Sequence, residues 1–314
     1  MFRFPSFRRQ PAGRASIAGA VGPGWCCAMV VVLAAGCNSF QPAEMRPQQP
    51  VLPCAQINPD LVDPFRPSND RPWERDQAVL ARAELDGDRV TVRNVRNCNY
   101  FAADNYIVRH YDKTYDLREL DSVDFIMVPF REAPMLGHTM LSFGFGDRDY
   151  LCVSVEIRKE QGEQFGALQG FFNQYEIMYV VGDERDLVKL RTNYREDEVY
   201  VYRARTSPER IRELFVDVMH RVNKLAREPE FYNTLTNNCT TNIRNHINRL
   251  APDRVPYDYR VMLPGYSDRL AYDLGLLDTE TSFAQTKQRS KVNYLAYLHR
   301  DSPDFSARIR QARR

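Results

Sequence analysis

Histidine and tryptophan are scarce in this 314-residue sequence, with five and two residues respectively. No His-Glu-x-x-His segment and no phosphate-binding glycine loop is present, and the spacing of the cysteines matches no zinc motif. The net charge of +2 is too small for a dedicated nucleic-acid-binding protein. The sequence therefore predicts no metal, no cofactor and no nucleic-acid partner.

The first 36 residues also lack any acidic residue, and an apolar run closes them at Ala28–Gly36. Glycines and Pro23 interrupt the preceding stretch, so its solidly apolar part is shorter than the about 20 residues of a membrane-spanning helix. This pattern is typical of a cleaved signal peptide over residues 1–36. Its positive start comprises Arg3, Arg8, Arg9 and Arg14.

Small residues directly precede Cys37, as in the lipobox of bacterial lipoproteins, whose cysteine becomes the lipidated first residue. Leu33 stands four positions before Cys37, whereas the lipobox leucine usually stands three before. An uncleaved signal anchor is the alternative. Either way we expect the chain beyond Asn38 to face the periplasm and to be held at a lipid membrane, and Asn38 favours the outer membrane.

Composition divides the rest of the chain into three parts. Residues 37–72 are rich in proline, glutamine and asparagine, which predicts a lipidated N-terminus and flexible linker. Residues 73–285 have the composition of one globular domain. Residues 286–314 form a basic tail, predicted to be solvated and partly disordered, for which contact with anionic lipid or cell-wall polymer is an alternative.

Six segments alternate in hydrophobicity or are rich in β-branched and aromatic residues. They are predicted as strands: Arg89–Val95, Phe125–Phe130, Thr139–Phe145, Leu151–Ile157, Tyr175–Val181 and Val199–Tyr202. A short polar loop containing Gly146 joins the third and fourth, which predicts an antiparallel hairpin.

Two helices are predicted after the strands. Pro208–Arg227 carries one apolar stripe, and Pro229 closes it. The second begins near Asn238 and runs to Leu250, with Thr236, Asn237 or Asn238 available as its N-cap. The fold class predicted from these elements is α+β, an antiparallel sheet with packed helices.

Four cysteines remain in the exported part of the chain. Cys98 follows a predicted strand and Cys152 lies within an apolar one, so both are interpreted as structural. In an oxidising compartment Cys54 and Cys98 are one possible disulfide pair. Cys239 differs, because it lies in the first turn of a helix, where the dipole and the free amides favour a thiolate and can hold an oxyanion.

A thiol nucleophile needs a base, and position eliminates four of the five histidines. His299 lies in the tail, and His220 lies beside the apolar stripe of the first helix. His110 lies in a polar segment interpreted as a solvated loop. His246 follows Cys239 by two helical turns, about 10 Å along the axis, and is interpreted as a surface or interface side chain. His138 remains, at the start of a predicted strand.

The partner strand of the hairpin offers two groups to orient His138, Glu156 and Ser154. A four-residue loop places His138 opposite about Ile157, and a register shift of one residue aligns it with Glu156. We favour Glu156 and leave the register open.

Three segments together resemble one known pattern: Leu136–Phe145, Cys152–Glu160 and Tyr232–Thr241. The chain resembles the N-terminal periplasmic domain of Lnb-type bacterial lipoprotein N-acyltransferases. The likeness covers roughly Val90 to Leu277 and extends through Arg93–Arg96, Tyr175–Tyr179, Gly182–Asp186 and Leu263–Tyr266.

The resemblance implies that Cys239 and His138 form a catalytic pair. It also implies a permuted papain-like arrangement, in which the histidine strand precedes the cysteine helix. The role of Glu156 as orienting residue is our inference. Fuller family members continue into several membrane-spanning segments, whereas nothing after Leu277 approaches about 20 apolar residues.

The function predicted from these features is thiol-based acyl transfer or hydrolysis at the cell envelope, with a lipoprotein or phospholipid as substrate. A cell-wall amidase or peptidase with the same thiol machinery is one alternative, and it predicts an open polar groove. A non-catalytic envelope lipoprotein is the other. It predicts Cys239 and His138 to be buried beyond hydrogen-bond reach of each other.

Overall fold

The computed structural model describes residues 63, 66–146, 148–163 and 175–311 of the chain. The predicted signal peptide, Cys37 and Cys54 lie outside these residues. The strands are β1 (Arg82–Asp86), β2 (Arg89–Arg96), β3 (Asn99–Tyr100), β4 (Tyr106–Ile107), β5 (His110–Asp116), β6 (Leu120–Pro129), β7 (Gly137–Phe145), β8 (Asp149–Arg158), β9 (Glu176–Gly182) and β10 (Tyr200–Arg203).

The helices follow mainly in the second half of the chain. They are α1 (Glu184–Lys189), the π-helix η3 (Leu190–Tyr194), α2 (Pro208–Arg227), α3 (Cys239–Leu250), α4 (Tyr259–Met262), the 3-10 helix η4 (Pro264–Tyr266), α5 (Ser267–Asp273), α6 (Phe283–Ser290), α7 (Asn293–Leu298) and α8 (Phe305–Arg308).

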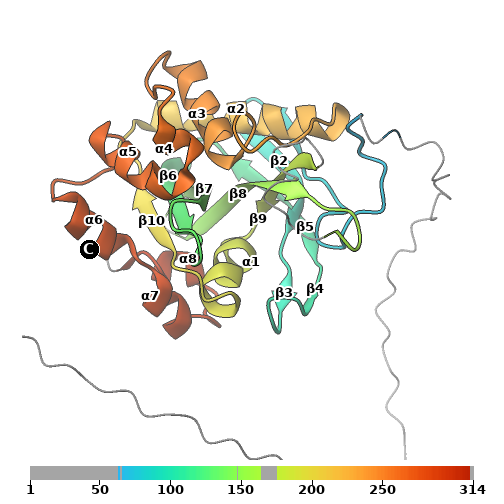
Figure 1. Ribbon diagram of the computed structural model, residues 1–314, viewed down its shortest axis with the longest axis horizontal. Helices are drawn as coiled ribbons and strands as arrows, with labels where there is room; N and C mark the ends of the chain where they lie inside the picture. The colour runs from blue at the N-terminus through green and yellow to red at the C-terminus, as the bar shows by residue number, and fades with distance from the viewer. Residues whose placement is uncertain (1–62, 64–65, 147, 164–174, 312–314) are drawn as a thin grey trace, which may run out of the picture. The chain divides into compact units, whose positions relative to one another are not determined.

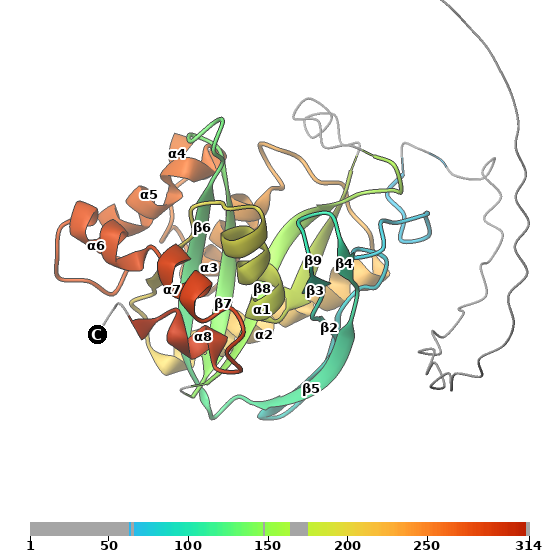
Figure 2. The same ribbon diagram turned by 90° about the horizontal axis from the view of Figure 1, so that it is seen from below.

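One sheet dominates the described part of the chain, with strand order β1-β2-β9-β8-β7-β6-β10 and β5 paired to β2. Its pairs are antiparallel except β2 with β9, which run parallel at a single position. Helices α2 and α3 cover one face, and α1, α7 and α8 cover the other (Figures 1 and 2). The fold class is therefore a mixed α and β arrangement around a mostly antiparallel sheet.

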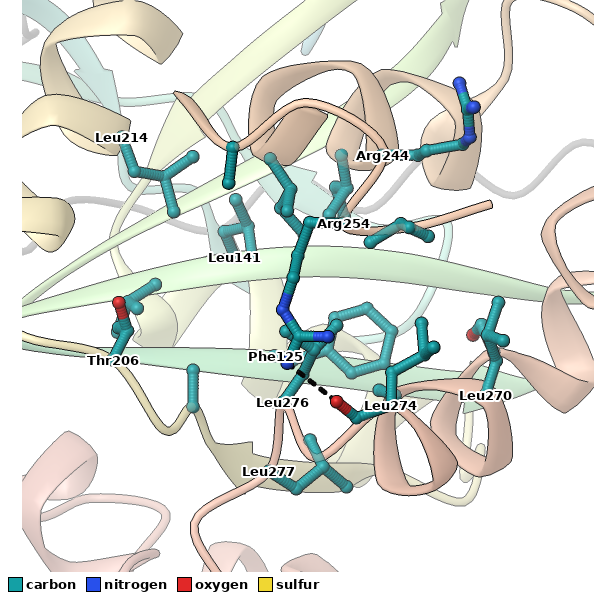
Figure 3. A pocket seen from close by; sticks show the side chains of 18 of the residues that line it. Phe125, Leu141, Thr206, Leu214, Arg244, Arg254, Leu270, Leu274, Leu276 and Leu277 are labelled. Carbon is teal, nitrogen blue, oxygen red and sulfur yellow. Dashed lines mark hydrogen bonds between the residues drawn. The ribbon is translucent and has the colours of Figure 1, made fainter. Parts of the chain in front are cut away.

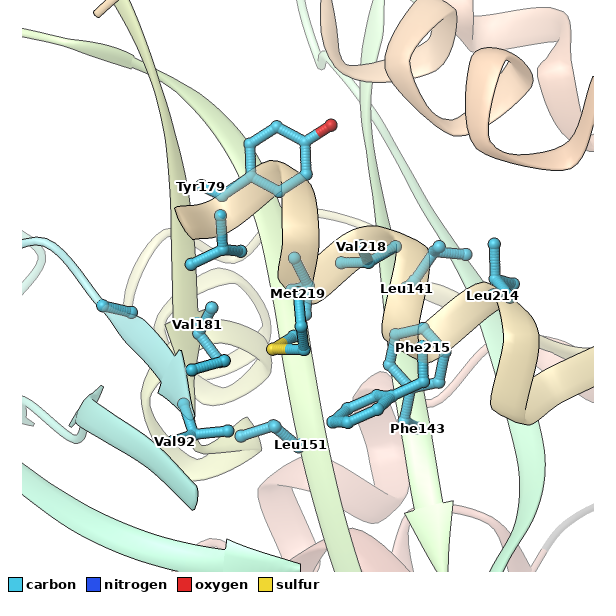
Figure 4. Close-up of a cluster of buried hydrophobic side chains, with 14 of the residues drawn as sticks. Val92, Leu141, Phe143, Leu151, Tyr179, Val181, Leu214, Phe215, Val218 and Met219 are labelled. Carbon is cyan, nitrogen blue, oxygen red and sulfur yellow. The ribbon is translucent and has the colours of Figure 1, made fainter. Parts of the chain in front are cut away.

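Helix α2 forms because Ser207 caps its first turn, Pro208 suits its first position and an apolar stripe faces the sheet. At its centre, Phe215 is fully buried and lies edge-on to Phe143, with ring centroids 5.1 Å apart (Figure 4). Truncating such a residue to alanine costs about 3–5 kcal/mol. This layer fixes β7 and β8 against the helical cover.

The sequence predictions of the main elements are confirmed. All six predicted strands are present, as β2, β6, β7, β8, β9 and β10, within a few residues of the expected bounds. The hairpin is antiparallel, with Met140 opposite Ser154. Helix α2 has the predicted bounds, and α3 begins at Cys239 with Asn238 as its N-cap.

Two predictions about flexible or solvated segments are wrong. His110 begins β5, which pairs with β2 and is not a loop, because Tyr115 on the same strand is buried in the core. The end of the predicted linker is also fixed. Asn69 donates to the carbonyl of Leu225, and Arg71 pairs with Glu176 at 2.9 Å.

The predicted disordered tail is folded as far as residue 311. Ala296 and Phe305 are fully buried in the core that covers the second face of the sheet. Arg310 is also buried and pairs with Asp124 at 2.7 Å and with Glu184 at 2.6 Å. The basic residues of the tail had suggested solvation. Instead, the buried side chains of Ala296 and Phe305 and the buried ion pairs of Arg310 hold the segment in place.

Of the suggested disulfide pair Cys54 and Cys98, Cys54 lies outside the described residues. Cys98, Cys152 and Cys239 are free, buried thiols. Burial, with the charge of Asp186, raises the pKa of Cys98 to about 12, and burial raises that of Cys152 well above 9.0. Both are therefore poor nucleophiles, in line with the structural interpretation.

Candidate active site

Cys239 is the first residue of α3 and is buried, with 4% of its surface exposed. The helix begins there because Asn238 and Thr241 form a reciprocal capping box. The Asn238 side chain accepts from the amide of Thr241, and the Thr241 hydroxyl accepts from the amide of Asn238. The Sγ atom consequently lies at the end of the helix where backbone amides lack helical acceptors.

His138 is the second residue of β7 and is 8% exposed. The pairing of Met140 with Ser154, continued by two residues, places His138 opposite Glu156. The register left open by the sequence is thereby resolved, and Ile157 is not the opposing residue. Ser154 and Glu156 project to the same side of β8, because side chains alternate along a strand.

A chain of short contacts leads away from the imidazole. His138 Nε2 lies 2.6 Å from Ser154 Oγ, and the Ser154 hydroxyl donates to Glu156 Oε1 at 2.6 Å. Glu156 Oε1 is itself 3.4 Å from Nε2 and accepts from Arg191 Nη2 at 3.0 Å. Both residues weighed from the sequence are therefore present, with Ser154 nearer the ring and Glu156 behind it.

The charges of this cluster favour an ionised thiol. Burial raises the pKa of Cys239, but its hydrogen bond with His138, the His138 charge and Thr139 outweigh burial and lower the pKa from 9.0 to about 7. Burial and Arg191 lower the pKa of His138, while Glu156 and Cys239 raise it above its ordinary value. A thiolate and an imidazolium stabilise each other here.

Burial alone raises the pKa of Glu156, yet the charges of His138 and Arg191 and the Ser154 hydroxyl hold it well below its usual range. Glu156 is consequently a carboxylate near neutral pH. As a carboxylate it can only accept hydrogen bonds, which fixes the direction of every bond that it makes.

Two threonines flank the thiol. The hydroxyl and backbone amide of Thr139 both lower the pKa of Cys239. Thr139 Oγ1 is 3.1 Å from Thr240 Oγ1, which is in turn 3.8 Å from Cys239 Sγ. Sequence reasoning missed Thr139, although its place beside His138 in the recognised segment was a signal.

Sequence reasoning also missed Arg191. It lies in the π-helix η3, at least 35 residues along the chain from every other residue of the site. Nothing in the sequence distinguishes it from the chain's many other arginines. The irregular backbone of a π-helix frequently marks a functional site, but it is visible only in the structure.

Of the rejected histidines, His246 was expected at a surface or an interface. It is buried, with 2% exposed, rather than at a surface. Its Nδ1 lies 2.5 Å from Asp217 Oδ2 and its Nε2 lies 2.8 Å from Tyr179 Oη. His220 is exposed and His299 ends α7, so neither joins the site.

An apolar cavity of about 230 Å³ lies between α3, α5 and the sheet (Figure 3). Thr240, whose Oγ1 is 3.8 Å from Cys239 Sγ, forms part of its wall. The remaining wall is mostly hydrocarbon, including Phe125, Leu141, Ile243, Leu270, Leu274 and Leu276.

Arg254 spans the cavity opening, where its Nη2 donates to the carbonyl of Leu274 at 2.7 Å (Figure 3). Among the described residues, no group of three or more His, Cys, Asp or Glu residues is placed to hold a metal ion. No helix within the same residues is long and apolar enough to span a bilayer.

The fold and the cysteine–histidine cluster define a mixed α and β domain with a buried thiol close to a histidine. The model of the Lnb N-terminal periplasmic domain matches residues 108–265, so the chain belongs to this family. Membership indicates a periplasm-facing protein of the cell envelope. No curated protein and no solved structure matches the chain.

Proposed function

We propose that the protein is a cysteine-dependent acyltransferase or hydrolase that acts on acyl groups of lipids or lipoproteins, with Cys239 as nucleophile and His138 as base. The observation that carries the proposal is a buried thiol at the start of α3 whose pKa His138 and Thr139 lower to about 7 against the effect of burial. Structural thiols in the same chain have raised pKa values.

The chemistry follows from the geometry. His138 takes the proton of Cys239, and the thiolate attacks the carbonyl carbon of an ester or amide. Free amides at the start of α3 stabilise the oxyanion. The leaving oxygen or nitrogen takes the proton from His138, which leaves a thioester. An acceptor amine then gives N-acylation, and water gives hydrolysis; in both cases His138 receives the acceptor's proton and Cys239 departs as thiolate.

The apolar cavity supports an acyl substrate over a polar one. A hydrocarbon chain attached to the thioester would pass Thr240 and leave water, at about 25 cal/mol for each Å² of apolar surface removed. A cell-wall amidase would instead need polar partners for a glycan or peptide. The strand-before-helix order of His138 and Cys239 further supports a permuted papain-like site.

We further propose that Cys37 is lipidated after removal of residues 1–36, with an uncleaved signal anchor as the alternative, and that the protein is held at the outer membrane. A tether of this kind raises the local concentration of lipid substrates without orienting the domain. Mass spectrometry of the mature protein and of its Cys37→Ala form tests this, because only lipidation predicts a diacylglyceryl mass on the N-terminal cysteine.

The experiment that tests the thiol mechanism is alkylation of the exported chain as a function of pH. The rate at Cys239 should be half-maximal near pH 7 and should shift toward that of an ordinary thiol in His138→Ala. Each unit of pKa shift lowers the rate at acid pH about tenfold. Cys239→Ala is the matched control, since labelling of Cys98 or Cys152 would persist in it. Reactivity that ignores His138 contradicts the proposal.

The acyl preference is tested with activated esters of increasing chain length. Filling the cavity with Ile243→Trp should lower acylation by long chains while leaving acetyl transfer and alkylation close to wild type. Leu235→Trp, at an exposed position outside the cavity wall, is the control. Equal losses for short and long chains in Ile243→Trp would contradict an acyl-chain pocket.

A further inference from the structure

Arg191 connects to the proposed base through the side chains of Glu156 and Ser154. We propose that Arg191 is a positioning residue that acts through Glu156 and Ser154 to keep the proton of neutral His138 on Nε2, so that Nδ1 is free to accept the Cys239 proton. The inference rests on the proposed function, but its central claim concerns a tautomer, which is measured separately from activity.

The first step is the fixation of Glu156. Arg191 is 5% exposed, and its Nη2 donates to Glu156 Oε1 at 3.0 Å. A buried guanidinium without a carboxylate partner is strongly unfavourable, so each charge holds the other in place. The π-helix η3 places Arg191 at this position, opposite the end of β8 that carries Glu156.

The second step is the direction of the Ser154 hydroxyl. A serine hydroxyl has one hydrogen, and the ionised Glu156 can only accept. Ser154 therefore donates to Glu156 Oε1, at 2.6 Å. With its hydrogen used, Ser154 Oγ can only accept from His138 Nε2, which lies 2.6 Å away. Nε2 must then carry a hydrogen, and the lone pair of neutral His138 is on Nδ1.

Among the described residues, few charged or titratable groups surround the hydrogen-bonded series from Arg191 to His138. His138 faces Cys239 from α3, Glu156 from β8 and Arg191 from η3. Burial and the charges of Cys239 and Glu156 raise the pKa of Tyr232. Burial and Arg191 lower the pKa of Arg195, while Glu156 raises it. Arg191 Nε is buried and has no hydrogen-bond partner in the described part of the chain, so its hold on Glu156 depends on Nη2.

Loss of Arg191 releases Glu156, and the Ser154 hydroxyl is then free to turn and donate to Nε2. That bond requires a lone pair on Nε2 and moves the proton of neutral His138 to Nδ1. An imidazole with Nδ1 protonated cannot accept a proton from Cys239 at that atom. The wrong tautomer of a catalytic histidine can remove most of its catalytic contribution even when the geometry is intact.

The test uses the exported chain with ¹⁵N-labelled histidine and Cys239→Ala, so that His138 titrates without the thiol. Nitrogen chemical shifts above the histidine pKa report which ring atom carries the proton. The Cys239→Ala protein without further substitutions should show His138 in the Nε2–H form. Arg191→Gln should shift His138 toward Nδ1–H, and Arg191→Lys should restore Nε2–H in part. Arg185→Gln, which removes the ion pair between Arg185 of α1 and its N-cap residue Asp183, should leave the tautomer unchanged.

A second pair of variants keeps the test decisive if Arg191→Gln does not fold. Glu156→Gln retains an acceptor oxygen for Ser154 and should keep Nε2–H, whereas Glu156→Ala frees the hydroxyl and should produce Nδ1–H. With Cys239 restored, Arg191→Gln and Glu156→Ala should each slow alkylation at pH 6 by roughly tenfold, equivalent to one unit of thiol pKa.

Full retention of the Nε2–H form in Glu156→Ala, or in folded Arg191→Gln, overturns the positioning role. In that event, a wild-type Cys239 that still reacts in a His138-dependent manner leaves the proposed function intact. Conversely, an unreactive wild-type thiol overturns the proposed function, while a tautomer shift in these variants still supports the relay.

Discussion

His138 and His246 are two buried histidines that each contact a hydroxyl through Nε2, yet their surroundings give them opposite properties. His138 contacts Ser154 through Nε2, and Glu156 and Cys239 raise its pKa. His246 lies between Asp217 on Nδ1 and Tyr179 on Nε2. The pKa of His138 is raised, whereas burial lowers that of His246 despite Asp217.

The comparison teaches that a buried histidine–carboxylate pair is not by itself a reactive site. The second partner of the imidazole, Tyr179 for His246 and Cys239 for His138, distinguishes the two sites. Burial raises the pKa of Tyr179, which therefore stays protonated, while the thiol of Cys239 has a pKa of about 7. Both Cys239 and His246 belong to α3, so the helix carries a thiol of lowered pKa at its start and a buried polar network farther along.

The largest expected effect separates the two histidines by activity. His138→Ala should lower acyl-transfer kcat/KM by roughly 10²- to 10⁴-fold, because general base catalysis typically contributes that much. Turnover of an activated long-chain ester measures it. Denaturant unfolding of the same variant serves as the control. A loss of activity that merely follows a loss of folded protein would remove the functional contrast between the two sites.

The complementary change is expected to affect stability. His246→Ala leaves Asp217 and Tyr179 without a shared partner, and it should lower the free energy of unfolding by about 1–3 kcal/mol. Urea denaturation measures this, and the pH profile of Cys239 alkylation should stay as in wild type. A profile displaced as far as in His138→Ala would show that the two networks are coupled through α3.

The sequence predicted the main strands, α2, α3 and the pair His138 and Cys239, because each signal is local. Period-two strands, an apolar helical stripe and a cysteine after a capping asparagine are all readable within about ten residues. The family resemblance added the association between segments about 100 residues apart. Whether that pair is catalytic is still a prediction.

The residues whose burial the sequence did not predict depend on partners that are distant along the chain. Arg191, Arg310 and His246 are all polar residues that sequence reasoning would assign to the surface, and all three are buried. Each is buried because a carboxylate from another element meets it: Glu156, Glu184 or Asp217. Composition cannot predict such pairs, since a charged residue is equally plausible on a solvated face.

A smaller effect is expected from Gly265→Ala, which should disturb the loop before β7 and therefore His138 but not His246. A Cβ atom at Gly265 would lie 1.9 Å from the carbonyl oxygen of Pro134, and the Gly265 amide donates to Met135. Gly265→Ala must displace this loop, two residues before Gly137, at a cost of about 1–2 kcal/mol.

The displaced loop should also slow Cys239 alkylation severalfold, because His138 directly follows Gly137, while Tyr179 and His246 should keep their contacts. Thermal unfolding and alkylation at pH 6 measure the two effects. Gly275→Ala is a useful contrast, since no atom lies within 4 Å of its added Cβ and its positive φ costs stability without touching the loop. Equal alkylation in both variants would show that the loop does not position His138.

The smallest effect is the pH dependence of stability, which should have opposite signs at the two histidines. The folded pKa of His246 is lowered, so its contribution is present above the unfolded value of about 6.5 and is lost as pH falls through the folded pKa. The folded pKa of His138 is raised, so its contribution is full below about pH 6.5 and is lost as pH rises through the folded pKa.

A Cys239→Ala background removes the titration of the thiol and leaves Glu156 as the group that raises the pKa of His138. In this background His246→Ala should flatten the rise in unfolding free energy below about pH 6.5. His138→Ala should instead remove a decline above about pH 6.5. The total change in unfolding free energy amounts to about 1.4 kcal/mol for every unit by which the folded and unfolded pKa values differ. Urea titrations from pH 5 to pH 8 measure both. Slopes of the same sign would mean that the two buried histidines respond to one common environment and not to their separate partners.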